Sequence, residues 1–210
     1  VPGESFEDWK ESVTAALSLP LDHLSAYALI VEEGTKLGAI VRRGDVVMPP
    51  DDETAEKYLL VDELATKAGM DWYEVSNWSL TGGEARHNIA YWHSNDWWGI
   101  GPGAHSHVQG VRWWNVKHPT TYILKLSSGE SPMLENETLT KEQIRFEEIL
   151  LRIRLSSGLP LDFFTENELG ILNSYLAQGH LDEKAWQSGE LKLSISGRLL
   201  ADQIVRSLDN

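Results

Sequence analysis

Apolar residues recur at helical spacing behind Ser5, a residue type that caps helices, and this pattern ends at Pro20. It predicts a first helix. Residues 23–31 follow as a short and almost continuously apolar run, which predicts a buried strand of a parallel sheet. A helix that leads into such a strand is typical of a βαβ series, so the chain is expected to begin inside one.

The next elements alternate in the same way. A loop is expected over residues 41–50, and the acidic residues after it predict a helix from Asp51 to about Lys67, with Gly69 just beyond its end. Residues 71–76 are predicted to form a strand. Helices and strands that alternate along the chain indicate an α/β fold.

From Pro119 onward helical patterns dominate. A short helix is predicted over residues 120–126, and the polar stretch after it is interpreted as a linker. A strong helix, shorter helical pieces, a hairpin strand and a last helix then describe a small winged-helix-like α+β domain. The predicted division is 1–118 for the first domain, 119–138 for the linker and 139–210 for the second domain.

Composition limits the classes of function. The 210 residues are 41% apolar and 24% charged, which is ordinary for a globular protein. Neither an apolar run of about 18 residues nor a signal peptide is recognisable, so no membrane span is expected. A net charge of −14 argues against nucleic acid as a partner. Because cysteine is absent, this chain holds no iron–sulfur cluster by thiolates, and a cytoplasmic location is expected.

The middle of the chain concentrates aromatic residues. Seven of the nine tryptophans lie between Trp72 and Trp114, and five of the seven histidines lie between His87 and His118. A glycine-rich run at 99–103 sits among them and lacks the Lys-Ser/Thr pair of a phosphate loop. We interpret this run as a tight strand crossing, because glycine lets another backbone approach closely.

Ordered motifs along most of the chain are similar to those of one family. They are Pro2-Gly3-Glu4-Ser5, His23-x-Ser25-x-Tyr27-x-Leu29-x-x-Glu32-x-Gly34-Thr35, Tyr73-Glu74-Val75-Ser76-Asn77-Trp78, Arg86-His87-Asn88-Ile89-Ala90-Tyr91-Trp92, Gly99-x-Gly101-x-Gly103-Ala104-His105-Ser106, Arg112-Trp113-x-Asn115, Leu151-Arg152-Ile153-Arg154 and Gly197-Arg198-Leu199-Leu200. With them the chain resembles the carboxy-terminal part of the HemW haem chaperones and the oxygen-independent coproporphyrinogen III oxidases. The resemblance implies the end of a radical S-adenosylmethionine partial TIM-like barrel, a β-rich extension and a winged-helix-like domain.

The His-Asn-x-x-Tyr-Trp element marks the haem-binding branch of that family. The resemblance therefore implies that His87 ligates haem iron, that Tyr91 and Trp92 line the site, and that Asn88 orients the ring or a propionate. The chemistry is compatible, since imidazole is a common axial ligand and aromatic side chains offer flat apolar faces to a porphyrin. Without the resemblance, His87 is interpreted as an ordinary surface histidine.

Other residues carry competing interpretations. Arg86 and Arg112 suit propionates, yet a salt bridge to one of the 32 acidic residues is the commoner role. His105 and His107 share one strand face, but no third metal ligand has suitable spacing, so a structural role is favoured. Glu74 and Glu32 could each be a carboxylate on the substrate side or on the S-adenosylmethionine side, but we favour their interpretation as polar strand-end or capping residues. The supporting motif residues are Tyr73, Glu74, Ser76, Asn77, Gly101, Gly103 and His105.

The start of the chain departs from the family pattern. The three cysteines spaced CxxxCxxC and the first barrel strands are absent. A 4Fe–4S cluster and S-adenosylmethionine are therefore expected only in an intact parent, with Leu29 and Ile30 as residual contacts to the latter. Catalysis by this chain alone is not expected.

Three functions stay open at this point. The first is part of a haem chaperone that passes haem to an acceptor protein, which is membrane-associated or respiratory. The second is a coproporphyrinogen III oxidase that decarboxylates propionates, and the third is a Trp-rich, non-catalytic binding module. Exposed barrel edges also predict a homodimer, because unpaired strand edges attract another strand.

Overall fold

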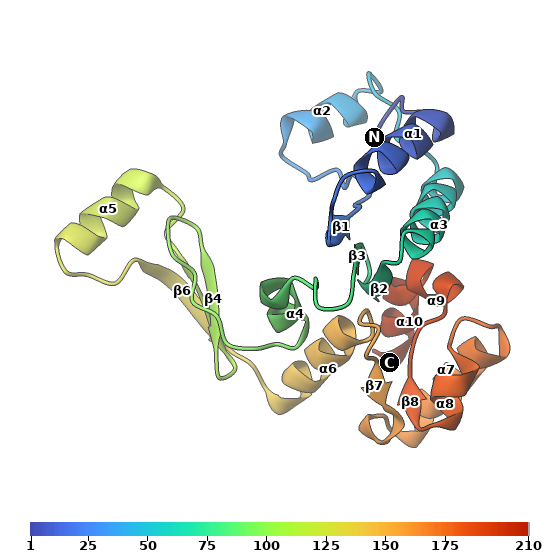
Figure 1. The fold of residues 1–210 in the computed structure, drawn as a ribbon. Coiled ribbons are helices and arrows are strands. Elements are labelled where there is room, and N and C mark those ends of the chain that lie inside the picture. Colours follow the sequence, from blue (N-terminus) through green and yellow to red (C-terminus); the bar gives the residue numbers. More distant parts are fainter. Residues whose placement is uncertain (210) are drawn as a thin grey trace.

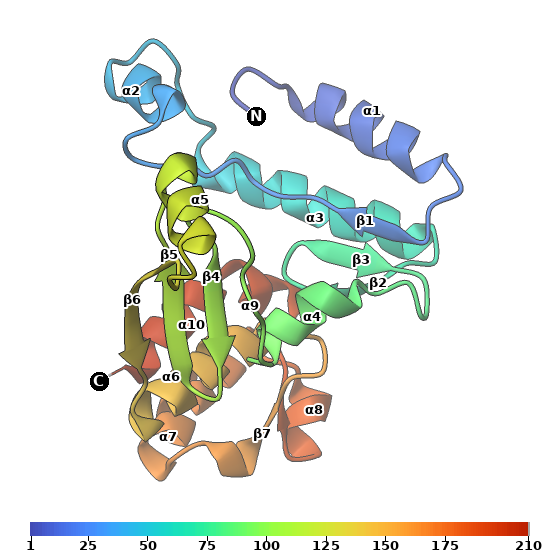
Figure 2. The same ribbon diagram turned by 90° about the vertical axis from the view of Figure 1, so that its left-hand side faces the viewer.

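Three small antiparallel sheets and the helices around them make up the fold (Figure 1). The computed structural model describes residues 1–209. The first sheet lies near the N-terminus, the second lies in an arm that extends away from the body, and the third lies among the C-terminal helices. Figure 2 shows the arm from its outer end, with its sheet face-on and helix α4 (Arg86–Trp92) between it and the first sheet.

Helices α1 (Phe6–Leu17) and α3 (Asp51–Lys67) share one hydrophobic core with the first sheet. The strand order of this sheet is β1 (His23–Ser25), β3 (Asn77–Ser79) and β2 (Asp71–Glu74). Both helices confirm the predicted ranges, and Ser5 caps α1 in a reciprocal pair with Asp8. The buried core residues are Val13, Val61, Ala65, Met70 and Trp78.

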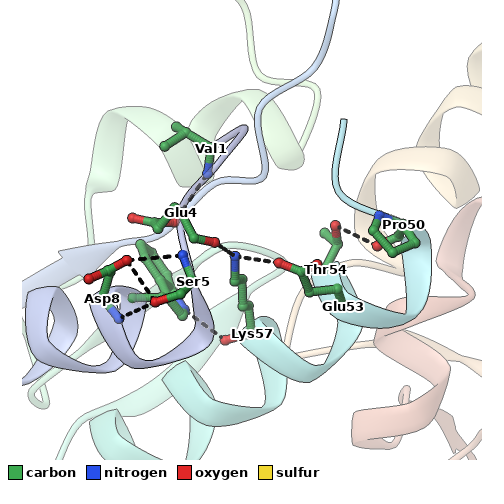
Figure 3. Close-up of polar contacts among 9 residues, drawn as sticks. Val1, Glu4, Ser5, Asp8, Pro50, Glu53, Thr54 and Lys57 are labelled. Atoms are coloured by element: carbon green, nitrogen blue, oxygen red, sulfur yellow. Dashed lines mark hydrogen bonds and ion pairs between the residues drawn. The ribbon is translucent and has the colours of Figure 1, made fainter. Parts of the chain in front are cut away.

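A buried lysine joins these two helices (Figure 3). The Nζ atom of Lys57 donates to the carbonyl oxygen of Glu4 at 2.6 Å and pairs with Glu53 at 2.8 Å. The indole N–H of Trp9 donates to the carbonyl oxygen of Lys57 at 3.0 Å. Because a buried charge is costly unless it is paired, these contacts fix the segment before α1 on α3.

The prediction of a parallel, buried strand over residues 23–31 is wrong. Strand β1 has three residues, pairs antiparallel with β3 and lies at the edge of its sheet. Leu29 and Ile30 lie beyond it and are 41% and 75% exposed. An apolar run therefore did not specify its pairing partner. Helix α2 (Lys36–Arg42), which Thr35 caps, was not predicted, and its end falls at the start of the loop expected over residues 41–50.

The arm contains the second sheet, with the order β4 (His105–Val108), β5 (Val111–Asn115) and β6 (Met133–Thr138). Helix α5 (Pro119–Ser127) lies at its outer end (Figure 1). Helix α5 confirms the helix predicted over residues 120–126, whereas strand β6, within the polar stretch interpreted as a linker, was not predicted. All six residues of β6 are exposed, so the strand lacks the alternation that reveals a half-buried strand.

The C-terminal region packs its helices around a second, larger core. Its elements are α6 (Lys141–Arg152), β7 (Leu159–Pro160), η1 (Leu161–Phe163), α7 (Glu166–Ala177), α8 (Glu183–Gln187), β8 (Glu190–Leu191), α9 (Ile195–Leu199) and α10 (Ala201–Leu208). Helices α6 and α7 confirm the predicted helices. The hairpin strand is shorter than predicted, and the single last helix is two helices that meet at Leu200. The domain boundaries and the winged-helix comparison stay predictions.

An arginine joins the C-terminal region to the N-terminal core. Arg198 of α9 donates to both carboxylate oxygens of Asp62 in α3, at 2.6 and 3.2 Å. Its guanidinium lies 4.3 Å from the ring centre of Trp72, and the indole N–H of Trp78 donates to the same carboxylate at 2.8 Å. Burial raises the pKa of the neighbouring Tyr58 to about 12. A largely buried ion pair, surrounded by aromatic side chains, thus holds the C-terminal region and the N-terminal core together.

Candidate functional site

Helix α4 presents the residues that sequence reasoning assigned to haem. His87 and Tyr91 lie one helical turn apart, with ring centres 4.8 Å apart and planes at 78°, so the tyrosine meets the imidazole edge-on. Both side chains are exposed. The spacing of i and i+4 explains the contact, because such residues share one face of a helix. The predicted ligand is therefore accessible and has an aromatic neighbour.

An aromatic chain continues from α4 to the second sheet. The ring of Tyr91 lies 5.0 Å from that of Trp97, and Trp97 lies 4.9 Å from His107 on β4. Trp97 and His107 also exchange both backbone hydrogen bonds, at 2.8 and 3.0 Å. We call His87, Tyr91, Trp97 and His107 the aromatic chain.

Sequence reasoning missed Trp97 and gave His107 only a structural role. Trp97 follows α4 by five residues, where no helical or strand periodicity places it near Tyr91. The available signal was the density of tryptophan and histidine in this stretch. His107 is 9% exposed, and its Nδ1 atom has no hydrogen-bond partner within residues 1–209.

Trp92 and the two arginines occupy different positions. Trp92 is half-buried and makes no ring contact with His87 or Tyr91 in the described part of the chain. Arg112 on β5 pairs with Glu137 and Glu147, each at 2.7 Å, as the salt-bridge interpretation expects. Arg86 is exposed and forms no ion pair among residues 1–209. Arg86 is therefore the better placed of the two for a propionate.

A polar cluster lies beneath α4 on β2. The hydroxyl of Tyr73 shares a hydrogen bond with Nε2 of His23 at 2.8 Å and accepts one from the Ala85 N–H at 3.4 Å. Glu74 is 1% exposed, and burial raises its pKa from 4.5 to about 7, although the Ser76 N–H and the Asn88 amide act in the opposite direction. The structure thus brings Tyr73, Glu74 and Asn88 together.

The remaining motif residues of the first sheet form a separate set of contacts. Asn77 is buried and accepts a hydrogen bond from the Ser25 hydroxyl. Its amide donates to the hydroxyl of Tyr27 at 3.0 Å. These contacts join the exit of β1 to β3 and do not involve α4, so their role is to hold the sheet.

The glycine-rich run is a close crossing of two backbones, as predicted. A Cβ atom on Gly99 would lie 2.0 Å from the carbonyl oxygen of His105. Gly101 has φ +111°, a value that favours glycine. His105 stacks on Trp114 at 5.7 Å with an interplanar angle of 25°. No group of three or more potential metal-ligating side chains occurs within residues 1–209.

A cleft of about 940 Å³ lies elsewhere, between the exit of β1, the start of α3 and the C-terminal helices. Leu29 is among its lining residues, whereas no member of the aromatic chain lines it within the described residues. The predicted contacts of Leu29 and Ile30 with S-adenosylmethionine stay predictions. None of the helices in residues 1–209 has the length and apolarity needed to cross a membrane.

Comparisons with known proteins agree on one group. The chain is 47% identical over 207 residues to the heme chaperone HemW of Mycobacterium tuberculosis, which covers 99% of this chain and 52% of that protein. The heme chaperones HemW of Lactococcus lactis and Bacillus subtilis are 36% and 32% identical, over 78% and 79% of this chain and 43% and 44% of theirs. The chain thus spans about half the length of the curated relatives it matches. No family model matches.

A solved structure gives the same fold. Coproporphyrinogen III oxidase of Escherichia coli, described as a radical SAM enzyme, superposes with a TM-score of 0.73. The superposition covers 100% of this chain and 53% of that protein, at 16% identity. The fold is therefore that of a radical SAM protein in part, without a closed barrel within residues 1–209.

Proposed function

The chain belongs to the HemW family, and from this premise we propose that α4 and the aromatic chain form a haem-binding site whose cargo is passed to an acceptor protein. The observation that carries the proposal is the exposed imidazole of His87, edge-on to Tyr91 and continued by Trp97. An imidazole nitrogen can ligate haem iron, and the edges and faces of the aromatic side chains can pack against the porphyrin.

The residues present fit haem and do not fit an iron–sulfur cluster. His87 supplies an accessible nitrogen, Tyr91 and Trp97 supply apolar area, and Arg86 supplies a cation without an ion pair among residues 1–209. The chain has no cysteine, so a 4Fe–4S cluster and S-adenosylmethionine chemistry belong, in this proposal, to the remainder of a HemW-type protein.

Oxidation of coproporphyrinogen III is the second candidate. The fold of the Escherichia coli oxidase favours it, but the likeness at 16% identity concerns the fold alone. The His-Asn-x-x-Tyr-Trp element on α4 favours haem binding. A homodimer also stays a prediction, and β1 at the edge of the first sheet is a strand that such pairing would use.

A haemin titration tests the proposal. The unmodified chain and His87→Ala are titrated with haemin while the Soret band is recorded. His93→Ala is the matched control, because His93 is an exposed histidine at the C-cap of the same helix. We expect saturable binding by the unmodified chain and by the control, and binding weakened about tenfold or more in His87→Ala. Equal binding by both variants, or no binding by the unmodified chain, would overturn the assignment.

A further inference from the structure

Helix α4 lacks the features that make a helix stable by itself. It has seven residues, its N-cap is Ala85, and no side chain of its own caps it. Helices this short are marginal without tertiary contacts, because nucleation costs more than a few hydrogen bonds return. The orientation of His87 must therefore depend on what lies beneath the helix.

Helix α4 packs against α6, and two residues of β2 add polar contacts at its start. The Tyr73 hydroxyl accepts a hydrogen bond from the Ala85 N–H at 3.4 Å, which satisfies a donor at the start of α4. The side-chain amide of Asn88 also acts to lower the pKa of the Tyr73 hydroxyl and of the Glu74 carboxyl, as a nearby hydrogen-bond donor does. Asn88 directly follows His87, so these contacts act one residue from the predicted iron ligand.

Strand β2 is itself fixed on its other side. The Ser156 N–H donates to the Tyr73 carbonyl oxygen at 2.9 Å, and Glu74 forms a β-bridge with Leu155. Tyr73 also shares its hydrogen bond with His23 of β1. The strand therefore gives α4 a base that is tied to both the first sheet and the C-terminal region.

The burial of the Glu74 carboxyl destabilises the fold unless another group interacts with it. The side chain is 1% exposed, and its Oε1 atom has no hydrogen-bond partner within residues 1–209. A buried polar group without a partner destabilises a fold, so an apolar residue would suit a purely structural position better. The Asn88 amide acts to lower the pKa of this carboxyl, so Asn88 is the residue of α4 that Glu74 would hold.

We propose that Tyr73 and Glu74 are positioning residues for His87, which hold the first turn of α4 through the Ala85 N–H and the Asn88 amide. This inference rests on the proposed haem site and extends it from the helix to the strand beneath it. Groups that orient a metal ligand typically change metal affinity about 10-fold to 100-fold when they are removed. Tyr73 and Glu74 act through the helix and need not touch haem.

Four variants of the full chain test this inference. Tyr73→Phe and Glu74→Ala remove the contacts, whereas Glu74→Gln keeps a group of the same shape that can hydrogen-bond with Asn88. Tyr27→Phe is the matched control, because Tyr27 follows β1 and its hydroxyl accepts a hydrogen bond from the Asn77 amide rather than from α4. Each variant is titrated with haemin, the Soret maximum is recorded at saturation, and amide hydrogen exchange of residues 86–92 is measured without haemin.

We expect Tyr73→Phe and Glu74→Ala to weaken haemin binding about 10-fold or more, shift the Soret maximum and accelerate exchange in α4. Glu74→Gln and Tyr27→Phe should match the unmodified chain in all three. Unchanged binding, Soret maximum and exchange in the first two variants would overturn the inference. If the unmodified chain binds no haemin, the proposed function fails, while exchange in α4 still decides whether Tyr73 and Glu74 hold the helix.

Discussion

The C-terminal region and the arm use apolar residues in opposite ways. The C-terminal core buries twelve residues, of which one, Phe164, is aromatic. The arm contains four tryptophans, at positions 97, 98, 113 and 114, and none of them is buried. Their rings meet other aromatic rings at the surface. Aliphatic residues thus make up most of the C-terminal core, whereas the tryptophans of the arm stay half-buried or exposed, where a ligand could reach them.

The largest expected effect concerns the C-terminal region, at the ion pair that joins it to the N-terminal core. Arg198→Ala leaves the largely buried Asp62 carboxylate without its cationic partner, although the Trp78 indole N–H still donates to it, and breaking a buried ion pair costs about 3–5 kcal/mol. We expect a loss of that size in the free energy of unfolding, measured by urea denaturation, with haemin affinity of the folded protein unchanged. Arg43→Ala is the control, because the Arg43–Asp45 pair is exposed and should contribute under about 1 kcal/mol. Equal losses in both variants would contradict the account.

The next effect concerns Glu74, the buried carboxyl on β2 that forms a β-bridge with Leu155 of the C-terminal region. Burial raises the pKa of Glu74 from 4.5 to about 7, so the folded state binds the proton more tightly than the unfolded chain. The stabilisation is therefore complete below about pH 4.5 and is lost as pH rises through about 7. Between about pH 5 and 8 we expect a decrease of about 2–3 kcal/mol in the free energy of unfolding from this residue.

Glu74→Gln isolates that contribution, since glutamine does not titrate. Urea denaturation of the unmodified chain and of the variant is compared at both pH values. The account predicts that the pH-dependent difference in the free energy of unfolding is smaller in the variant. An identical pH dependence in both proteins would show that the buried carboxyl does not govern it.

Local signals made much of the fold predictable. The helices α1, α3, α6 and α7 have clear caps or periodicity, which are properties of neighbouring residues. Strand β6 was missed because a fully exposed edge strand has no apolar face. The run 23–31 was misjudged because hydrophobicity does not determine whether a strand pairs parallel or antiparallel, or ends early.

The sequence predicted only those residues of the candidate site that lie on helix α4. The motif places His87, Asn88 and Tyr91 within one short segment because their spacing is local, and the structure shows that this segment is helix α4. Trp97 and His107 joined the site through a backbone pairing between the segment after α4 and β4. Such a pairing depends on the path of the chain in three dimensions and has no signature in the spacing of residues.

The most direct test of the central claim is to measure binding and stability together in Trp97→Leu, with Trp98→Leu as the control. Trp97 contacts Tyr91 and His107, whereas Trp98 is 70% exposed and contacts Trp113. The account predicts that Trp97→Leu raises the Kd for haemin about tenfold, which is about 1.4 kcal/mol, while the free energy of unfolding falls by less than about 1 kcal/mol. Trp98→Leu should change neither quantity. A large loss of stability in Trp97→Leu with an unchanged Kd would contradict the claim that the arm keeps its aromatic residues for a ligand.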